Sequence, residues 1–351
     1  MVTFLPSRPG RLADVPSFTR AIGGAESNVA CALAAAGHRV QWVGRVGADG
    51  FGDHLVDTVG GHGVDVTAVG RDPHRPTGIY FRTDEDRATD AHEVVYYRAG
   101  SAASAMSPAT VPYESVAGAR ILHLTGITAA LSGDCLALVR ELTAPRPGRP
   151  LVSFDVNHRP ALWRDGDAPG VLLELARRAD LVFVGADEAE RLWGLGDARA
   201  VFEALPEPGT VVVKRGGTGA VAVDGETRGG GGVLVPAPRV DVVSPIGAGD
   251  AFAAGFLSAT LRGLGLRSRL RHGHLTAAAA LTVPGDLAVP PRRELADRLA
   301  ALDDAAWGTL HLGPGWTEAD ERDPGRTGPG RTGDGPEGTG RAGDDQEVRT
   351  P

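Results

Sequence analysis

Apolar and polar positions follow two rhythms along this chain, and the longer part has short apolar runs separated by amphipathic stretches. Short, continuously apolar runs are typical of buried parallel strands, and the longer stretches between them are typical of covering helices. From residue 119 onward the alternation predicts an α/β fold with a central, mostly parallel sheet and helices on both faces. The predicted strands are 120–124, 151–156, 181–184, 210–213 and 220–223, and the predicted helices are 134–142, 171–179, 186–192, 251–261, 267–280 and 292–302.

The part before residue 101 has a different pattern, in which short strands alternate apolar and polar side chains. Segments 77–82 and 93–98 are predicted to form a small antiparallel sheet with Tyr80, Tyr96 and Arg98 at one end, which suits a lid over a polar ligand. Core packing is the alternative for each tyrosine. Short strands at 2–5 and near 18–22, helices at 29–36 and 49–59, and a buried strand at 40–46 complete this part.

These patterns predict one domain at residues 1–305, with lid strands at about 8–22 and 76–100. The remainder, 306–351, consists mainly of Gly, Pro, Thr, Arg, Asp and Glu. We expect this tail to be disordered because it has too few apolar side chains to offset its ordering entropy.

Composition and charge exclude several classes of function. The net charge of −8 argues against a nucleic-acid partner, and no apolar run is long enough to span a membrane. Cys31 and Cys135 lie far apart and form neither a disulfide framework nor a zinc motif. We therefore expect a cytoplasmic protein that acts on small molecules.

The stretch 244–252 carries the strongest chemical signal. Gly247 and Gly249 lie at a strand-to-helix turn, where backbone N–H groups and the helix dipole form an anion-binding site. Asp250 at this position would repel an anion, so a role as the base that deprotonates an attacking hydroxyl fits better. The simpler alternative is that Asp250 is an N-cap and the glycines only make a turn.

Further polar residues follow predicted strands, where ligands of such sheets bind. Asn28 follows a glycine pair and can donate and accept hydrogen bonds, as a sugar hydroxyl requires. Lys214, the single lysine, precedes a glycine-rich turn at 215–219. Because the chain otherwise uses arginine, Lys214 is a candidate for a specific role, with chance survival as the alternative. The other candidates at strand ends include Asn157, Arg159 and Glu188.

Residues 23–28 and 244–257 together resemble the two signatures of the ribokinase-like (PfkB) carbohydrate kinases. The resemblance covers about residues 1–300 and is strongest to members that phosphorylate 2-keto-3-deoxygluconate, through stretches 42–47, 96–102, 123–128 and 155–159. It implies ATP-dependent phosphorylation of a sugar-acid hydroxyl, here giving the 6-phosphate. A kinase for another sugar, such as fructose or another keto-deoxy sugar, and an inactive sugar-binding paralogue are the alternatives.

The resemblance also implies roles for the candidate residues. Asp250 is the expected base, and the N–H groups of Gly247, Ala248 and Gly249 hold charge on the transferring group. Guanidinium groups suit the substrate carboxylate. The implied substrate contacts are Gly24, Asn28, Tyr80, Tyr96, Arg98 and Arg159, and the implied ATP contacts are Asn157, Lys214, Arg215, Gly216, Gly219 and Gly249. Mg²⁺ would bridge the phosphates and reach Glu188 through water.

Two departures from the family pattern stand out. We expect the chain to lack the family's first sheet strand, because residues 2–5 match the segment that normally follows it. The family's Asn-x-x-Glu motif is here Gly185 to Glu188, so only the Glu is retained. The lid, with its open strand edges, predicts a homodimer or a higher homo-oligomer.

Overall fold

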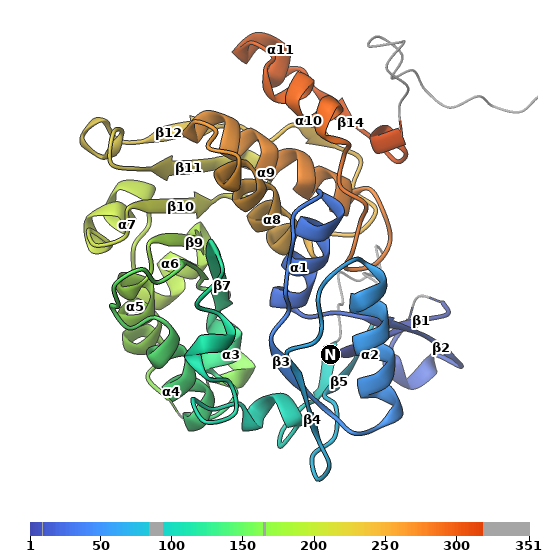
Figure 1. Cartoon of the computed structure of the whole chain (residues 1–351). Coiled ribbons are helices and arrows are strands. Elements are labelled where there is room, and N and C mark those ends of the chain that lie inside the picture. Colours follow the sequence, from blue (N-terminus) through green and yellow to red (C-terminus); the bar gives the residue numbers. More distant parts are fainter. Residues whose placement is uncertain (9, 84–93, 164–165, 319–351) are drawn as a thin grey trace, which may run out of the picture.

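The computed structural model describes residues 1–318 except 9, 84–93 and 164–165, so the predicted tail at 319–351 lies outside the described residues. Its largest element is a six-stranded sheet in the order β12-β11-β10-β9-β8-β7 (Figure 1). Strands β7 to β10 are parallel to one another, while β11 and β12 are antiparallel additions. Their bounds are β7 Ile121–Thr125, β8 Leu151–Asp155, β9 Leu181–Gly185, β10 Thr210–Lys214, β11 Ala220–Val223 and β12 Val233–Val235.

Helices cover both faces of this sheet, which confirms the predicted fold class. Alternate side chains of β9 enter different cores: Val182 and Val184 pack in one cluster, Leu181 and Phe183 in the other. A strand buried on both faces must be apolar throughout, as β9 is. The first face carries α3 Gly126–Ala129, α4 Gly133–Leu142, α5 Ala168–Arg178, α6 Ala186–Trp193 and α7 Ala198–Ala204, and the second carries α1 Ala25–Ala35, α8 Ala248–Leu261, α9 Leu266–Leu281 and α10 Arg293–Ala300.

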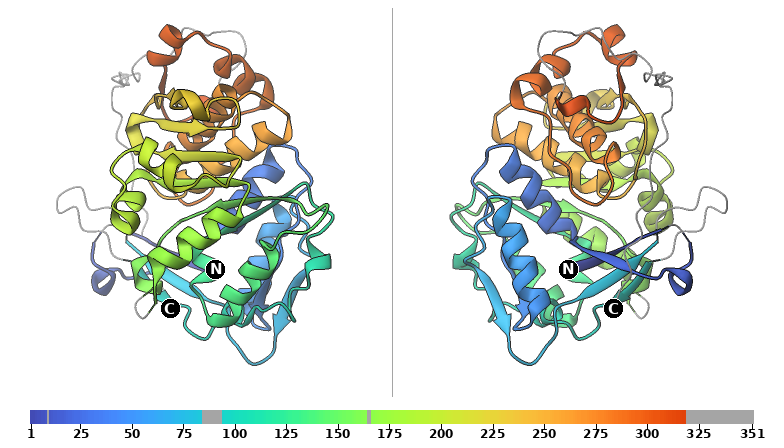
Figure 2. Two further views of the ribbon diagram at one scale, coloured as in Figure 1. Left: turned by 90° about the vertical axis from the view of Figure 1, so that its left-hand side faces the viewer. Right: turned by 90° about the vertical axis from the view of Figure 1, so that its right-hand side faces the viewer.

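The second core extends past the predicted domain boundary at residue 305. Helix α11 (Asp304–Gly308) and strand β14 (His311–Leu312) follow, and β14 pairs with β13 (Arg239–Val240). Trp307 and Trp316 are buried in the same cluster as Phe256. The boundary prediction was therefore too early, because two tryptophans in a Gly- and charge-rich context bury enough surface to hold this segment. In the side views of Figure 2, α9 and strands β10 to β12 lie at one end of the molecule and the amino terminus lies toward the other.

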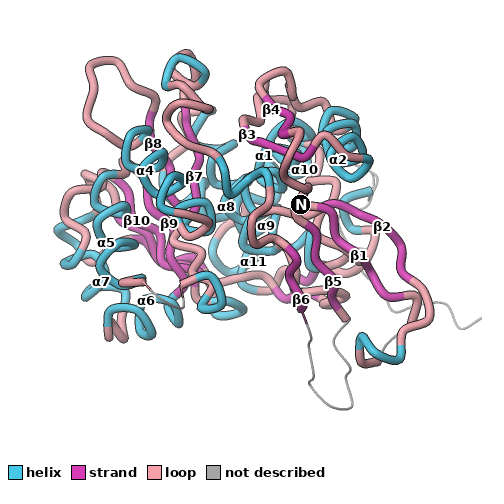
Figure 3. Tube along the Cα trace, turned by 90° about the horizontal axis from the view of Figure 1, so that it is seen from below, coloured by secondary structure: helices cyan, strands magenta, loops and turns pink. Residues whose placement is uncertain are grey.

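The lid is a four-stranded sheet in the order β2-β1-β5-β6. It consists of β1 Val2–Pro6, β2 Phe18–Ile22, β5 Ile79–Arg82 and β6 Val94–Tyr97. The segments predicted for it are present, and β1 joins them as an inner strand between β2 and β5. Seen from below, this sheet lies apart from β7 to β10, with the amino terminus between the two groups (Figure 3).

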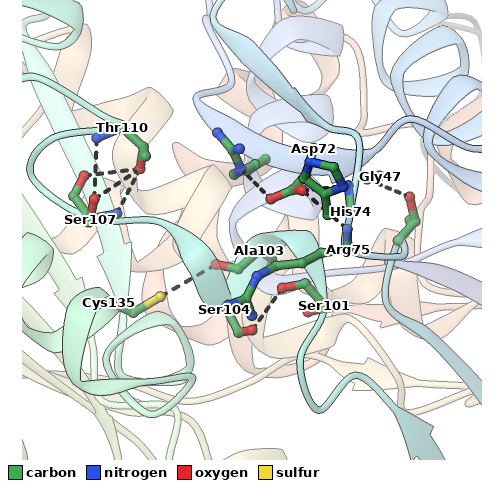
Figure 4. A network of polar contacts seen from close by, with 12 residues as sticks. Gly47, Asp72, His74, Arg75, Ser101, Ala103, Ser104, Ser107, Thr110 and Cys135 are labelled. Carbon is green, nitrogen blue, oxygen red and sulfur yellow. Dashed lines mark hydrogen bonds and ion pairs between the residues drawn. The ribbon is translucent and has the colours of Figure 1, made fainter.

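A smaller unit, β3 (Gly44–Gly47), α2 (Gly50–Gly61) and β4 (Val69–Asp72), connects lid and core. Polar contacts fix the loop after β4 and the segment after β6, as Figure 4 shows: Asp72 accepts from the N–H groups of His74 and Arg75, and the Ser104 hydroxyl donates to the Ser101 carbonyl. The Gly47 N–H donates to the Thr77 hydroxyl, which leads directly into β5. The segment that leads into lid strand β5 is therefore held in place by this hydrogen bond. No helix among the described residues is long and apolar enough to cross a membrane.

Candidate active site

The site is built around the first turn of α8. Gly247 precedes the helix with φ 77°, a left-handed conformation that favours glycine, and a Cβ there would lie 2.3 Å from the backbone oxygen of Asp286. The free N–H groups of this turn follow at Ala248 and Gly249. The Gly-Ala-Gly stretch thus has the local geometry of an anion-binding helix start, as the sequence predicts.

Asp250 lies in that first turn and faces Asn28 of α1. The Asn28 amide donates to the Asp250 carboxylate over 2.9 Å, although the two residues are 222 positions apart in the sequence. Burial raises the pKa of Asp250 to about 7; the Asn28 hydrogen bond, Lys214 and Arg159 oppose that rise, and Asp155 adds to it. A carboxylate with a pKa near neutrality can accept a proton from a hydroxyl and release it afterwards. The Asn28 carbonyl oxygen is buried and has no hydrogen-bond partner among the described residues, so it is available to a ligand.

The glycine pair before α1 is required by close contacts. A Cβ on Gly23 would lie 2.1 Å from the Tyr80 hydroxyl and 2.6 Å from an Asp286 carboxylate oxygen, and Gly24 has φ 149°. Tyr80 donates to Asp286 over 2.7 Å, and burial together with Asp286 raises the pKa of the phenol, which remains protonated. The lid is thereby joined to the turn that follows α9.

Two further lid residues face the same region. The Tyr96 ring lies 5.5 Å from the Tyr80 ring, centroid to centroid. Arg98 follows β6; burial lowers the pKa of its guanidinium, while Glu26 opposes the change. Its Nε is buried and without a hydrogen-bond partner in the described part of the chain. Arg159, by contrast, is exposed, and its positive charge acts on Asp250.

Lys214 belongs to this centre. It ends β10, and its ammonium donates to Asp155 at the end of β8 over 2.7 Å. Burial alone would lower the pKa of Lys214, but Asp155 and Glu188 raise it above the ordinary value, so the group is charged. A Cβ on Gly249 would lie 3.8 Å from the Lys214 ammonium, which places this charge beside the anion-binding turn. Asn157, two residues beyond β8, is buried with φ 37°, a conformation that asparagine tolerates.

The predicted ATP turn lies immediately after Lys214. Residues Gly216–Thr218 form a short 3-10 turn, and Arg215 and Gly216 are exposed. Gly219 has φ 119°, and a Cβ there would lie 2.3 Å from the Val235 carbonyl oxygen. The turn therefore presents backbone and one arginine to solvent at the carboxyl end of β10, where a ligand can approach.

Glu188 lies on α6, and its two carboxylate oxygens accept from the N–H groups of His158 and Gly185, both over 2.8 Å. These bonds join the ends of β8 and β9. The described residues contain no cluster of three or more metal-ligating side chains. Mg²⁺ keeps most of its water ligands and needs only one or two carboxylates beside substrate phosphates. Glu188 and the unpartnered, buried Oδ1 of Asp155 fit that kind of site.

Two residues of this centre, Asp286 and Glu26, were not among the candidates predicted from the sequence. Asp286 follows α9 in a Pro-Gly turn; it accepts from Tyr80 and forms an ion pair with buried Arg82 over 3.2 Å. Glu26 accepts hydrogen bonds from the hydroxyls of Thr125 and Thr128, which ties α1 to the end of β7. Glu26 lies within the glycine-rich stretch and could have been found there. Asp286 gave no sequence signal beyond an acid after a turn.

Residues 2–292 match the family described as pfkB family carbohydrate kinase. The chain is 34% identical to 2-dehydro-3-deoxygluconokinase of Bacillus subtilis over 86% of this chain and 93% of the relative. It is 36% identical to the enzyme of the same name from Thermoproteus tenax, over 84% and 90%. A solved sugar kinase of Pyrococcus horikoshii in complex with ATP superposes with a TM-score of 0.74 at 25% identity, covering 88% of this chain and 97% of that one.

Proposed function

Because the chain belongs to the PfkB family of carbohydrate kinases, we propose that it transfers the γ-phosphoryl group of ATP to a hydroxyl of a sugar acid. The proposed substrate is 2-keto-3-deoxygluconate, also called 2-dehydro-3-deoxygluconate, and the proposed product is its 6-phosphate. The names of the two curated relatives support this choice, and so does the charge of the lid.

Arg98 is the observation that favours a sugar acid over a neutral sugar. Its side chain is half-buried beside Tyr80 and Tyr96, and its buried Nε has no hydrogen-bond partner within the described structure. A buried N–H group without a partner is costly, and a substrate carboxylate would satisfy the Arg98 Nε with a charge-assisted hydrogen bond. A neutral sugar would offer the Arg98 guanidinium no opposite charge beyond that of nearby Glu26.

Asp250 is the proposed general base. Its carboxylate takes the proton of the attacking hydroxyl as the oxygen bonds to the γ-phosphorus and the bond between that phosphorus and the leaving oxygen of ADP breaks. The N–H groups of Gly247, Ala248 and Gly249 and the Lys214 ammonium then stabilise negative charge on the transferring group. Asn28 orients the base through its 2.9 Å bond and offers its free carbonyl oxygen to the sugar.

ATP is proposed to lie along residues 216–219, with Arg215 and Asn157 beside it. Mg²⁺, when bound, neutralises phosphate charge and holds the phosphates in line. Glu188 and Asp155 are the carboxylates proposed to hold its water shell. Asp155 also keeps the Lys214 ammonium near Gly249 through their 2.7 Å contact.

The proposal predicts that Arg98→Ala raises KM for 2-keto-3-deoxygluconate by about 10- to 100-fold, the value of a lost hydrogen bond to a charged group. KM for a neutral sugar such as fructose should change little, because that sugar has no carboxylate. Steady-state kinetics with both sugars measure the two effects.

Arg20→Ala is the matched control, since Arg20 is an exposed arginine on β2, at the opposite edge of the same lid sheet. It should leave both KM values unchanged. Equal losses for acid and neutral sugar in Arg98→Ala would remove the sugar-acid assignment and leave a kinase for another sugar.

We also propose that the lid is the surface through which two copies pair. Strand β6 is an edge of the lid sheet, and Tyr97 on it is 62% exposed. An open edge with an exposed aromatic side chain is favoured as a pairing surface. The cytosol is the proposed location, because ATP is supplied there and both cysteines are free.

A further inference from the structure

A buried ion pair lies beneath the lid, next to Tyr80. Arg82 is the last residue of β5, and its side chain is only 3% exposed. Its guanidinium lies 3.2 Å from the carboxylate of Asp286, whose side chain is 6% exposed. Among the described residues Arg82 is the only ion-pair partner of Asp286. Removing two charges from water is costly, so a pair kept in this position is a candidate for a specific role.

Two residues of one lid strand share the same carboxylate. Side chains two positions apart on a strand point to the same face, and Tyr80 and Arg82 are such a pair. The Tyr80 hydroxyl donates to one oxygen of Asp286 over 2.7 Å, and the Arg82 guanidinium lies by the other oxygen. Phe81 points to the opposite face, where its ring stacks on Phe4. Figure 3 shows this strand, β5, within the lid sheet.

The ion pair is held by charge and lacks a completed hydrogen-bond network. The Arg82 Nε and the Asp286 Oδ1 are both buried and have no hydrogen-bond partner among the residues that the structure describes. A buried pair that served stability alone would gain most from paired hydrogen bonds between guanidinium and carboxylate. The positive charge of Arg82 is therefore the property that acts on Asp286.

The charge on Asp286 decides the direction of the Tyr80 hydrogen bond. An ionised carboxylate can only accept, so Tyr80 must donate its single proton to it, and the phenol oxygen is left with acceptor lone pairs. A protonated carboxyl group can donate, which would reverse the bond and free the Tyr80 proton for another partner. Without a cation beside it, a buried carboxyl group favours the protonated form, and Arg82 opposes this.

The Tyr80 hydroxyl lies where this direction matters for a ligand. It is so close to the glycine pair before α1 that a Cβ on Gly23 would collide with it, and Asn28 of the same helix holds Asp250. A phenol oxygen with only acceptor capacity binds a sugar hydroxyl and repels a carboxylate. The unpartnered Nε of Arg98 suits the carboxylate instead. A sugar acid then has one favourable orientation.

We propose that Arg82 is a positioning residue that keeps Asp286 ionised, so that Tyr80 accepts a hydrogen bond from a substrate hydroxyl and sets the orientation of the sugar acid. This inference rests on the proposed function, because it takes Tyr80 as a contact of the sugar. Arg82 acts through Asp286 and Tyr80 and need not touch the substrate itself.

The first test reads the Tyr80 hydrogen bond in the protein without substrate. The chain has four tyrosines, so NMR of protein labelled with ¹³C at tyrosine Cζ identifies the Tyr80 signal by its loss in Tyr80→Phe. The Cζ chemical shift responds to whether the hydroxyl donates or accepts. We expect Arg82→Met to move the Tyr80 signal, and Arg82→Lys, which keeps the charge, to leave it near its position in the parent.

Arg262→Met is the matched control for this measurement. Arg262 is a partly buried arginine that pairs with Asp297 over 2.7 Å at the far end of α8, away from the lid. Its replacement removes an ion pair without changing the surroundings of Tyr80, so the Tyr80 signal and the affinity for the sugar acid should match those of the parent.

The second test separates positioning from stability. Calorimetry should show that Arg82→Met raises Kd for 2-keto-3-deoxygluconate about tenfold, the value of one lost hydrogen bond, and leaves ATP affinity unchanged. In the double variant Arg82→Met/Asp286→Asn no buried charge is unpaired, so Tm should return toward that of the parent. The raised Kd should remain, because a neutral amide does not fix the direction of the Tyr80 bond.

Tyr80→Phe completes the test as a double-mutant cycle. Added to Arg82→Met, it should raise Kd little further, because both changes remove the same hydrogen bond to the sugar. Independent effects that multiply would overturn the inference. An unmoved Tyr80 signal in Arg82→Met would also overturn it, as would a double variant Arg82→Met/Asp286→Asn that regains both Tm and affinity.

The inference and the proposed function fail in different ways. The NMR signal and the calorimetric Kd require no phosphoryl transfer. A parent protein that binds the sugar acid with the expected variant pattern but does not phosphorylate it would refute the proposed activity alone. An active kinase whose Tyr80 signal is the same in the parent and in Arg82→Met would refute the role of Arg82 alone.

Discussion

Asp250 combines two properties that a base for sugar phosphorylation needs: a fixed orientation and a pKa near neutrality. Asn28 supplies the first through a hydrogen bond from another helix, and burial supplies the second. An N-cap aspartate would be exposed and would accept from its own helix. Asp250 instead lies inside the first turn, which begins after Gly247, so the simple capping role does not describe it.

The raised pKa of Asp250 predicts the pH dependence of activity. The base must be deprotonated, so kcat/KM should fall about tenfold per pH unit below a midpoint near 7. The rate of ADP release between pH 5 and 9 at saturating ATP measures this. A profile that stays flat down to pH 5 would assign the proton to another group.

The same shift has an opposite consequence for stability. The pKa of Asp250 is 3.8 ordinarily and about 7 in the fold, so between these values the folded state holds a proton that the unfolded state has lost. Asp250 therefore contributes stability at low pH that is lost as pH rises through 7. At pH 8 the Asp250→Asn variant should have a higher Tm than the parent. The Tm of the variant should also lack the fall with rising pH that Asp250 causes in the parent.

The roles of individual residues could be predicted where a required backbone conformation leaves glycines in the sequence. The glycines before Asn28 and Asp250 marked two helix starts, and both side chains meet in the fold. Asp286 could not be predicted, because its role depends on how the turn after α9 meets β5. Its neighbours Tyr80 and Arg82 are some 200 positions away, and no local rule of sequence reports that contact.

At the scale of elements, the two ends of α8 offer a matched comparison. Gly247 and Gly263 both have left-handed φ, 77° and 73°, but only a Cβ on Gly247 would collide with backbone, 2.3 Å from the Asp286 oxygen. Gly263→Ala should cost about 1–2 kcal/mol, the strain of a left-handed L-residue. Gly247→Ala should cost more and also lower kcat, because the turn with its N–H groups must move.

Urea unfolding and steady-state kinetics of the two variants test this. Gly263→Ala is expected to keep the parent kcat, since its helix end is remote from the site. Equal losses of stability with unchanged kcat in both variants would show that the Gly247 turn does not position the phosphate.

Element prediction succeeded where apolar runs were buried on both faces. Strands β7 to β10 lie within a residue or two of their expected positions for that reason. The strand implied before the 244–252 turn is short, because β13 has only two residues and the following Val242 and Val243 are 50% and 47% exposed. The short strands β4 and β12 had no distinct pattern, because pairing rather than burial defines them.

At the scale of the whole molecule, the proposed pairing of two copies depends on the open edge of the lid sheet. Tyr97→Asp places a charge on the open edge of β6 and should shift a lid-paired dimer toward monomer. Sedimentation velocity at several protein concentrations measures the change. An unchanged sedimentation coefficient across that range would show that the lid edge is not the pairing surface.

The division into a large sheet and a lid could be predicted from the change of hydrophobic pattern near residue 101. The resemblance to the family supported the same arrangement of sheet, lid and connecting unit. Contacts between segments that are distant in the sequence could not be predicted. Trp307 and Trp316 carry the fold past the expected boundary, and β1 lies inside the lid between β2 and β5. Both depend on packing partners distant in sequence, which composition cannot identify.

The central claim is that Asp250 deprotonates a sugar-acid hydroxyl facing the Gly247 to Gly249 turn. Its most direct test is ADP release with 2-keto-3-deoxygluconate by the parent and by Asp250→Asn, with the product identified by ³¹P NMR and ATP affinity measured by calorimetry. We predict formation of the 6-phosphate by the parent, a rate about 10²- to 10⁴-fold lower in the variant, and similar ATP affinity. Parent-like turnover in Asp250→Asn, or a folded parent that binds ATP but phosphorylates no sugar acid, would contradict it.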